Sequence, residues 1–126
     1  MRVLIPELSA SDIDIFHVRY NAVHTGAERD VFPHLPADGA RPGMVAFTAT
    51  SWRQLLNPGK IPSGERVPTA ADCYRFVLSN PAIDVCMTGP SSQQHVGDML
   101  QALDRGPMNE EEMGWMRRVG QAIYGK

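Results

Sequence analysis

Several features are scarce or missing in this chain of 126 residues, and each absence excludes a class of protein. There are only two cysteines, Cys73 and Cys86, and their spacing fits neither a CxxC redox motif nor a metal site. They predict reduced, buried thiols rather than a disulfide, which is typical of a cytoplasmic protein. No apolar run is long enough to span a membrane. Pro6 and Glu7 end the short N-terminal apolar run before it reaches the length of a signal-peptide core.

An excess of charge of one sign is also missing. Twelve Lys and Arg residues against fourteen Asp and Glu residues give a net charge of −2, and the two signs are interspersed. Such a chain lacks the excess of basic residues that binding to nucleic acid or to an anionic membrane requires, so we expect neither partner. The hydrophobic share of 43% is enough for one modest core, and residues 1–126 are expected to form one domain or part of one.

The common sequence fingerprints of open α/β sheets are absent as well. The chain contains no GxGxxG dinucleotide motif, no GxxxxGK[ST] phosphate loop and no GxSxG nucleophile motif. His24, His34 and His95 are too dispersed to suggest a metal site, because no two of them share one helical face at i, i+4 spacing. We therefore expect no metal.

What is present is a regular alternation of strand and helix patterns. The strands are expected at 12–20, 43–50 and 83–87. The middle strand has almost no polar alternation, which predicts a strand covered by helices on both faces. Between it and the next helix, residues 57–68 lack periodicity and are expected to form a loop.

Four helices follow from caps and apolar spacing. The expected ranges are 26–35, with Pro33 bending or ending the helix, 70–79 after the cap Thr69, 92–103, and 110–124 after the cap Asn109. The third presents Val96, Leu100 and Leu103 on one face, and the last turns Met113, Met116, Val119 and Ile123 inward.

This order of elements predicts an α/β chain with parallel strands and right-handed crossovers. Either an open doubly wound sheet or a section of an eight-stranded barrel fits the pattern, and periodicity does not separate the two.

The junction between the third strand and its helix is the most informative stretch. The strand ends at Gly89, and the helix begins through Ser91 and Ser92. A helix N-terminus offers unpaired backbone N–H groups and a partial positive charge, so this junction is a candidate phosphate site. The alternative is that one of the serines only caps the helix.

The strand ends together resemble the last third to half of an aldo/keto reductase. Phe16 to Asn21 is similar to the family's sixth strand, Gly43 to Trp52 to the seventh, and Val85 to Leu103 to the eighth strand and its helix. Residues 75–81 and 106–112 are also similar to phrases of this family. The resemblance implies a partial (β/α)8 TIM-type barrel, comprising roughly the last three strand-helix units and a C-terminal helix.

The family uses NADP or NAD to transfer hydride to an aldehyde or ketone. Its catalytic Asp, Tyr, Lys and His lie on the early strands, so the resemblance implies that all four would lie upstream of Met1. The chain is then a truncated, cofactor-binding half that is inactive alone. The alternative is a non-catalytic dinucleotide-binding or interaction module that associates with another chain or another copy through its exposed strand edges.

The family's cofactor contacts carry over unevenly. His17 stands where the family has a Gln that contacts the nicotinamide amide, and Ala49 stands where many members place a stacking aromatic ring. Thr50 and Ser51 are expected to reach the pyrophosphate, or else to serve as loop hydrogen-bonders. Among the nearby cations, Arg53 and Lys60 could touch phosphate, although solvation is the favoured interpretation for both.

The basic clamp that grips the 2′-phosphate of NADP is missing from the strand-helix junction. His95 is the only basic side chain between Thr88 and Gly97, so the choice between NADP and NAD stays open. Met99 replaces the Asn usually near the adenine, while Asp98 is a neighbouring acidic group. The residues expected to contact the dinucleotide are His17, Thr50, Ser51, Gly89, Pro90, Ser91, Ser92 and Asp98.

Overall fold

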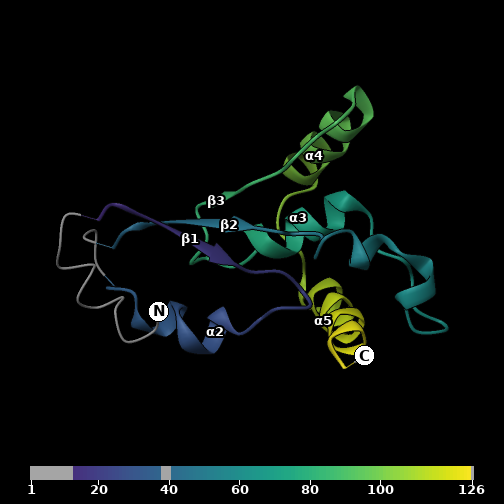
Figure 1. The fold of residues 1–126 in the computed structure, drawn as a ribbon, viewed down its shortest axis with the longest axis horizontal. Helices are drawn as coiled ribbons and strands as arrows, with labels where there is room; N and C mark the ends of the chain where they lie inside the picture. Colours follow the sequence, from purple (N-terminus) through teal and green to yellow (C-terminus); the bar gives the residue numbers. More distant parts are fainter. Residues whose placement is uncertain (1–12, 38–40, 126) are drawn as a thin grey trace.

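Three parallel strands form the centre of the molecule. The structure is a computed structural model that describes residues 13–37 and 41–125. Strands β1 (Ile15–Arg19), β2 (Gly43–Phe47) and β3 (Val85–Cys86) pair in the order β1-β2-β3, and both pairings are parallel. All three carboxyl ends therefore lie at one edge of the sheet, and the expected α/β class is confirmed (Figure 1). The N-terminal segment and Asp12 lie outside the described residues.

The strands are shorter than their apolar runs. We expected the second strand to continue to residue 50, but β2 ends at Phe47 because Thr48 adopts a left-handed φ of 59°. The third strand pairs only through Val85 and Cys86, opposite Val45 and Ala46 near the end of β2. A strand thus ends where the backbone of its partner turns away. The apolar pattern of one segment contains no information about the position of that turn.

The helices begin largely where their capping residues predict. Thr69 and Asp72 form a capping box at the start of one helix, and Asn109 and Glu112 form another. The region expected to be one helix over 26–35 is instead a single helical turn and a short 3₁₀ helix, since Pro33 has no N–H to continue the ladder. The helices are α2 (Ala27–Asp30), α3 (Ala70–Leu78), α4 (Gln93–Arg105) and α5 (Glu110–Tyr124).

The core lies on one face of the sheet. Alternate residues of β1 and β2 are buried against α3 and α5, as the period of two in a strand requires. The buried residues that meet there include Phe16, Val18, Tyr20, Met44, Ala46, Phe76, Val77, Trp115, Met116 and Val119. Cys73 is buried among them, Cys86 is half-buried, and both are free thiols.

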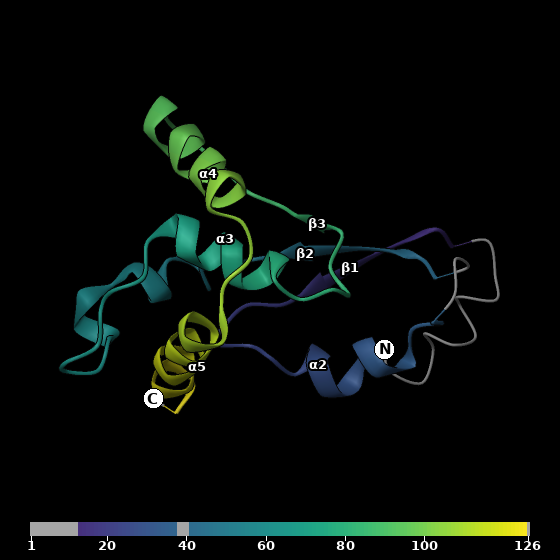
Figure 2. The same cartoon turned by 180° about the vertical axis from the view of Figure 1, so that it is seen from behind.

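The other face of the sheet is not covered by the described residues, which corrects the expectation for the middle strand. Ile15 is 60% exposed and Val85 52% exposed, while Val45 is half-buried. Figures 1 and 2 show α5 on one side of the strands and α4 on the other, where α4 projects outward.

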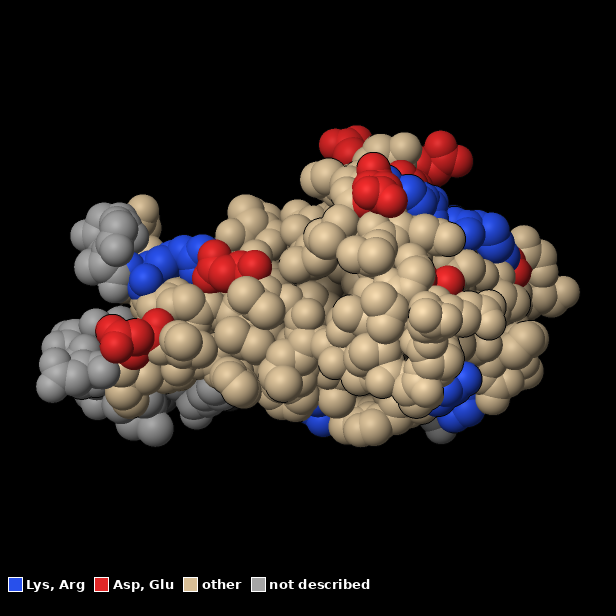
Figure 3. Space-filling view, turned by 90° about the horizontal axis from the view of Figure 1, so that it is seen from above, with Lys and Arg blue, Asp and Glu red and all other residues tan. Residues whose placement is uncertain are grey.

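Helix α4 also departs from expectation. Its apolar face, with Leu100 55% and Leu103 67% exposed, is not packed into the core, and Ala102 is its one buried residue. Figure 3, seen from the side of α4, shows charged side chains at the ends of the molecule and around α4, with a wide uncharged surface between them. We call the exposed residues Ile15, Val85, Met87, Val96, Leu100 and Leu103 the open apolar surface.

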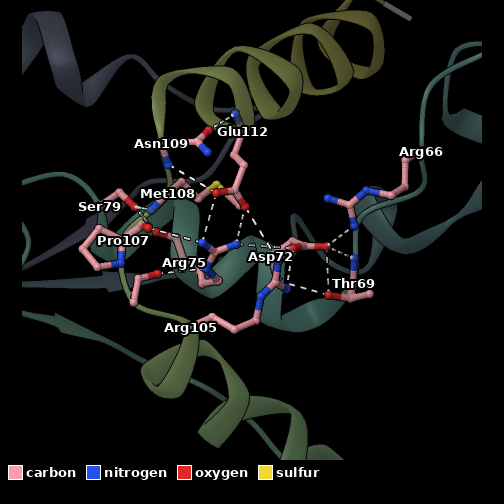
Figure 4. A network of polar contacts seen from close by, with 11 residues as sticks. Arg66, Thr69, Asp72, Arg75, Ser79, Arg105, Pro107, Met108, Asn109 and Glu112 are labelled. Atoms are coloured by element: carbon pink, nitrogen blue, oxygen red, sulfur yellow. Dashed lines mark hydrogen bonds and ion pairs between the residues drawn. The ribbon is translucent and has the colours of Figure 1, made fainter.

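A buried ion-pair network joins α3 to α5 (Figure 4). Arg75 of α3 is 4% exposed and donates to both carboxylate oxygens of Glu112 and to the carbonyl groups of Gly106 and Pro107. The carboxylate of Asp72 accepts hydrogen bonds from Arg66 and Arg105. This network holds the loop before α5 against α3, and thereby fixes where α5 crosses the fold.

None of the helices in the described part of the chain has the length and apolar character needed to cross a membrane.

Candidate functional site

A cleft lies at the carboxyl ends of β2 and β3. It has a volume of about 380 Å³ and three walls: the loop after β2, the start of α3, and the junction between β3 and α4. The polar residues that line it are Thr50, Arg53, Thr69, Tyr74, Ser91, His95 and Asp98. We call this feature the strand-end cleft.

The loop after β2 forms its first wall in an unusual conformation. Ser51, Trp52 and Arg53 have φ values of 52°, 52° and 69°, in the left-handed region that residues other than glycine rarely occupy. The Thr50 hydroxyl accepts a hydrogen bond from the backbone N–H of Arg53 at 3.2 Å. Such backbone strain persists only where the surrounding structure enforces it, and it is often found at functional sites.

Asn21 is the residue that holds this loop from outside. It is fully buried, and its side-chain amide donates to the carbonyl oxygen of Thr48 at 2.8 Å. Its carboxamide oxygen accepts from the backbone N–H groups of Val23 and His24. One side chain therefore ties the loop after β1 to the loop after β2. In the sequence, Asn21 showed only that the first strand ends.

The junction between β3 and α4 forms the opposite wall. Ser92 caps α4, because its hydroxyl accepts from the backbone N–H of His95 at 3.2 Å. The backbone N–H of Ser91 donates to Nδ1 of His95, so the neutral imidazole carries its proton on Nε2. A Cβ added at Gly89 would meet no neighbouring atom, so the backbone is open to a ligand at this point.

The structure brings five of the eight expected contact residues into the strand-end cleft. These are Thr50, Gly89, Pro90, Ser91 and Asp98. Ser92 is occupied as the cap of α4 and does not line the cleft. Ser51 is fully buried, and its hydroxyl has no hydrogen-bond partner within the described chain. His17 is exposed on β1, on the uncovered face of the sheet.

Arg53 is exposed, as its sequence context favoured, and it also lines the cleft. Its side chain lines the cleft, whereas Lys60 lies outside it and donates to Gln54. The available signal was its position three residues after Thr50, at a strand end. Nothing in the sequence could show that this loop faces a junction more than thirty residues further along the chain.

The polar side chains that line the cleft are mainly hydrogen-bond donors. In the described residues, no ion pair or side-chain hydrogen bond engages the guanidinium of Arg53. Burial raises the pKa of Tyr74, with a smaller effect from the nearby thiols and Asp98, so its hydroxyl remains a neutral donor. A guanidinium, an imidazole N–H and hydroxyl groups form a suitable donor set for phosphate oxygens. The carboxylate of Asp98 is suited to accept from ligand hydroxyls.

Comparisons with known proteins bear on the fold. No protein-family model matches this sequence, and a search of curated proteins also finds no match. The aldo-keto reductase AKR11C1 from Bacillus halodurans, in its holo and apo forms, is similar in structure, with a TM-score of 0.68 and 20% identity for each. Each match covers 96% of this chain, but only 47% of the holo and 48% of the apo reductase chain. The fold is therefore that of about half of an aldo-keto reductase barrel, as the resemblance implied.

Proposed function

We propose that this chain binds the phosphate-bearing part of a nicotinamide dinucleotide in the strand-end cleft. The observation that carries the proposal is that Arg53, Thr50 and Ser91 line one cleft at the carboxyl ends of two parallel strands. Ligands of barrels and of open parallel sheets bind at this edge. The similar reductase spans about twice the length of this chain, so a cofactor-binding half is a consistent assignment.

Each lining residue has a part in this proposal. Arg53 supplies the cation that the β3–α4 junction lacks, and it reaches the cleft from the opposite wall. Ser91 and Thr50 offer hydroxyl donors to phosphate oxygens, and the start of α4 adds a favourable dipole. Asp98 accepts from ribose hydroxyl groups. Ala49 is buried and offers no ring to stack on nicotinamide, so the adenosine and phosphate end carries the binding.

A bound nicotinamide dinucleotide would supply hydride, but carbonyl reduction also needs a proton donor beside the carbonyl oxygen. The resemblance places the family's Asp, Tyr, Lys and His in the half that this sequence does not contain. The chain alone is then a binding half without turnover, whether the cofactor is NADP or NAD.

Calorimetric titration of the purified chain with NADP and with NAD tests the proposal. Replacing Arg53 with Gln should weaken NADP binding at least about tenfold, because a charge-assisted hydrogen bond to phosphate is lost. Lys60→Gln is the matched control, since it removes the same charge from the adjoining turn outside the cleft. It should bind like the parent chain.

Comparing NADP with NAD also shows which phosphate group Arg53 contacts. A loss confined to NADP identifies the 2′-phosphate as the partner of Arg53, and an equal loss for both identifies the pyrophosphate. Failure of the parent chain to bind either nucleotide at millimolar concentration would contradict the proposal, as would equal binding by Arg53→Gln.

The open apolar surface favours a second candidate function, association with another copy or another chain. It consists of six large apolar side chains on the sheet and on α4 that are each more than 40% exposed, and exposed apolar residues in such number favour a contact with another molecule. The outer edges of β1 and β3 have no strand partner among the described residues. In this candidate, the chain is an interaction module that a complementary part-barrel completes.

Light scattering of the purified chain tests the second candidate. It predicts concentration-dependent association that Leu100→Lys weakens, because the substitution places a charge in the contact. Gln101→Lys, on a different face of α4, is the control and should associate like the parent. A monomer at all concentrations that retains nucleotide binding would favour the cofactor-binding assignment alone.

A further inference from the structure

A second concave region lies apart from the strand-end cleft and shares no lining residue with it. It has a volume of about 490 Å³ and lies between the loop after β1 and helix α5. Three arginines line it, Arg19, Arg29 and Arg117, while no Asp or Glu side chain does. We call it the arginine pocket. Its size is within the range of small-molecule sites.

Two of the three arginines are held by acidic partners. Arg117 of α5 forms two hydrogen bonds with the carboxylate of Glu28, at 3.0 Å and 2.8 Å. Arg29 likewise forms two with the carboxylate of Asp30, at 2.8 Å and 2.9 Å. These pairs are oriented by bidentate geometry, so the cations border the pocket in defined positions.

Arg19 differs from both. It is the last residue of β1, it is exposed, and no hydrogen bond or ion pair engages its side chain in the part of the chain that the structure describes. It lines the pocket together with His24, and burial and then the charge of Arg19 lower the pKa of that imidazole below its usual value. Arg19 and His24 therefore border the same space.

His24 lies at the wall of the pocket, in contact with two aromatic rings. Its ring packs edge-to-face against Trp52 and Tyr124, with centroid distances of 5.9 Å and 6.2 Å. Its Nδ1 lies 3.3 Å from the side-chain oxygen of the buried Asn21, which orients the ring and assigns the Nδ1 proton. Thr25 and Tyr124 also line the pocket, and each carries a hydroxyl group that can donate a hydrogen bond.

We propose that the arginine pocket binds a small oxyanion, the carboxylate or phosphate group of an organic molecule, with Arg19 as the principal charged contact. The guanidinium of Arg19 can donate two parallel hydrogen bonds to the anion. Arg29 and Arg117 border the same space while they stay paired with Asp30 and Glu28. His24 donates to the anion from Nε2 when it is protonated. This site does not depend on dinucleotide binding in the strand-end cleft.

The pKa of His24 can be used to follow anion binding in the arginine pocket. In ¹H NMR titrations of the full chain against pH, inorganic phosphate should raise the pKa of His24 by about half a unit or more, because the anion offsets the charge of Arg19 and favours the imidazolium. The charged and titratable groups that face His24 are Arg19 from β1 and Tyr124 from α5. The signal is assigned with His24→Gln. Acetate, tested in parallel, distinguishes a site for phosphate alone from one for carboxylates as well.

Arg19→Gln should abolish this shift and weaken phosphate binding at least about tenfold. Arg118→Gln is the matched control, because Arg118 belongs to α5 but pairs with Glu65 outside the pocket. It should leave the shift intact. The circular dichroism spectrum of each variant reports its fold. A His24 pKa that responds to neither anion in the parent chain, or that responds equally in Arg19→Gln, would overturn the proposal.

Discussion

Gly120 of α5 lies so close to the carbonyl group of Ala22 that a Cβ at this position would overlap with that backbone. The helix therefore crosses the loop after β1 at near contact distance, and this contact sets the position of α5 beside the arginine pocket. Within α5, the requirement for a residue without a side chain is specific to this position. A Cβ at Gly114 would meet only the flexible end of Arg118, at an ordinary 3.6 Å.

These two glycines give a matched pair of predictions. Gly120→Ala should destabilise the chain by about 2–3 kcal/mol, because the overlap forces α5 away from the loop. Gly114→Ala should stabilise it by about 0.5–1 kcal/mol, since alanine favours a helix interior. Urea unfolding followed by circular dichroism measures both. Equal effects of the two substitutions would show that α5 does not approach the loop so closely.

The environment of Asp72 predicts how the unfolding free energy of the chain depends on pH. Burial alone would raise the pKa of this carboxyl, but hydrogen bonds from Thr69 and the charges of Arg66 and Arg105 outweigh it, so the pKa is lowered. The stabilising contribution is then fully present above the unfolded value of about 3.9 and is lost as the pH falls through the lower folded value.

Asp72→Asn should therefore be less stable than the parent at pH 7, by about 2 kcal/mol, and should lose less further stability on acidification below about pH 4. Asp104→Asn, which changes an exposed carboxylate of α4, is the control and should follow the parent curve. Unfolding free energies measured from pH 7 down to about 3 check this prediction. Parallel curves for the parent and Asp72→Asn would contradict it.

Tyr20 predicts a cost for removing one hydroxyl group from the core. The ring is fully buried, its hydroxyl donates to Glu28, and it accepts from Asn80 at 3.4 Å. Tyr20→Phe leaves the Glu28 carboxylate without this donor and should cost about 1–2 kcal/mol. Tyr124→Phe removes an equivalent hydroxyl from an exposed ring and should leave the unfolding free energy unchanged. An unfolding free energy that Tyr20→Phe leaves unchanged would show that water replaces the lost donor.

Catalysis supplies the fourth prediction. The chain incubated with NADPH and a panel of aldehydes should show no oxidation above background, because the proposed half-barrel lacks the family's proton donor. The absorbance of the reduced nicotinamide follows the reaction. Protein-dependent oxidation would contradict the assignment as a non-catalytic half.

Local sequence signals predicted the elements well where the signal and its effect lie within a few residues. Thr69 with Asp72, and Asn109 with Glu112, form the two capping boxes that mark the starts of α3 and α5. The apolar residues of 12–20 likewise predicted a strand in the region where β1 lies. Each of these features depends on the geometry of one turn or one strand, so the neighbouring residues are sufficient to specify it.

The same apolar pattern on α4 gave no information about what would cover it. Leu100 and Leu103 lie on one helical face, as their spacing predicts, but this face is exposed because α4 contacts α3 through its other side. An amphipathic pattern indicates that one face of a helix is apolar, but it does not indicate which surface will bury that face.

The chain's periodicity and caps specified the order of its strands, the starts of α3, α4 and α5, and its α/β class, because these depend on interactions between residues close together in sequence. The tertiary structure alone decided that Arg53 faces Ser91 across the strand-end cleft, and that Arg19 and Arg117 border a second pocket. Those pairs are separated by 38 and 98 residues, respectively, in the numbering of the chain. Only the pairing of the strands and the packing of α5 against the loop after β1 bring them together, and no local pattern encodes that packing.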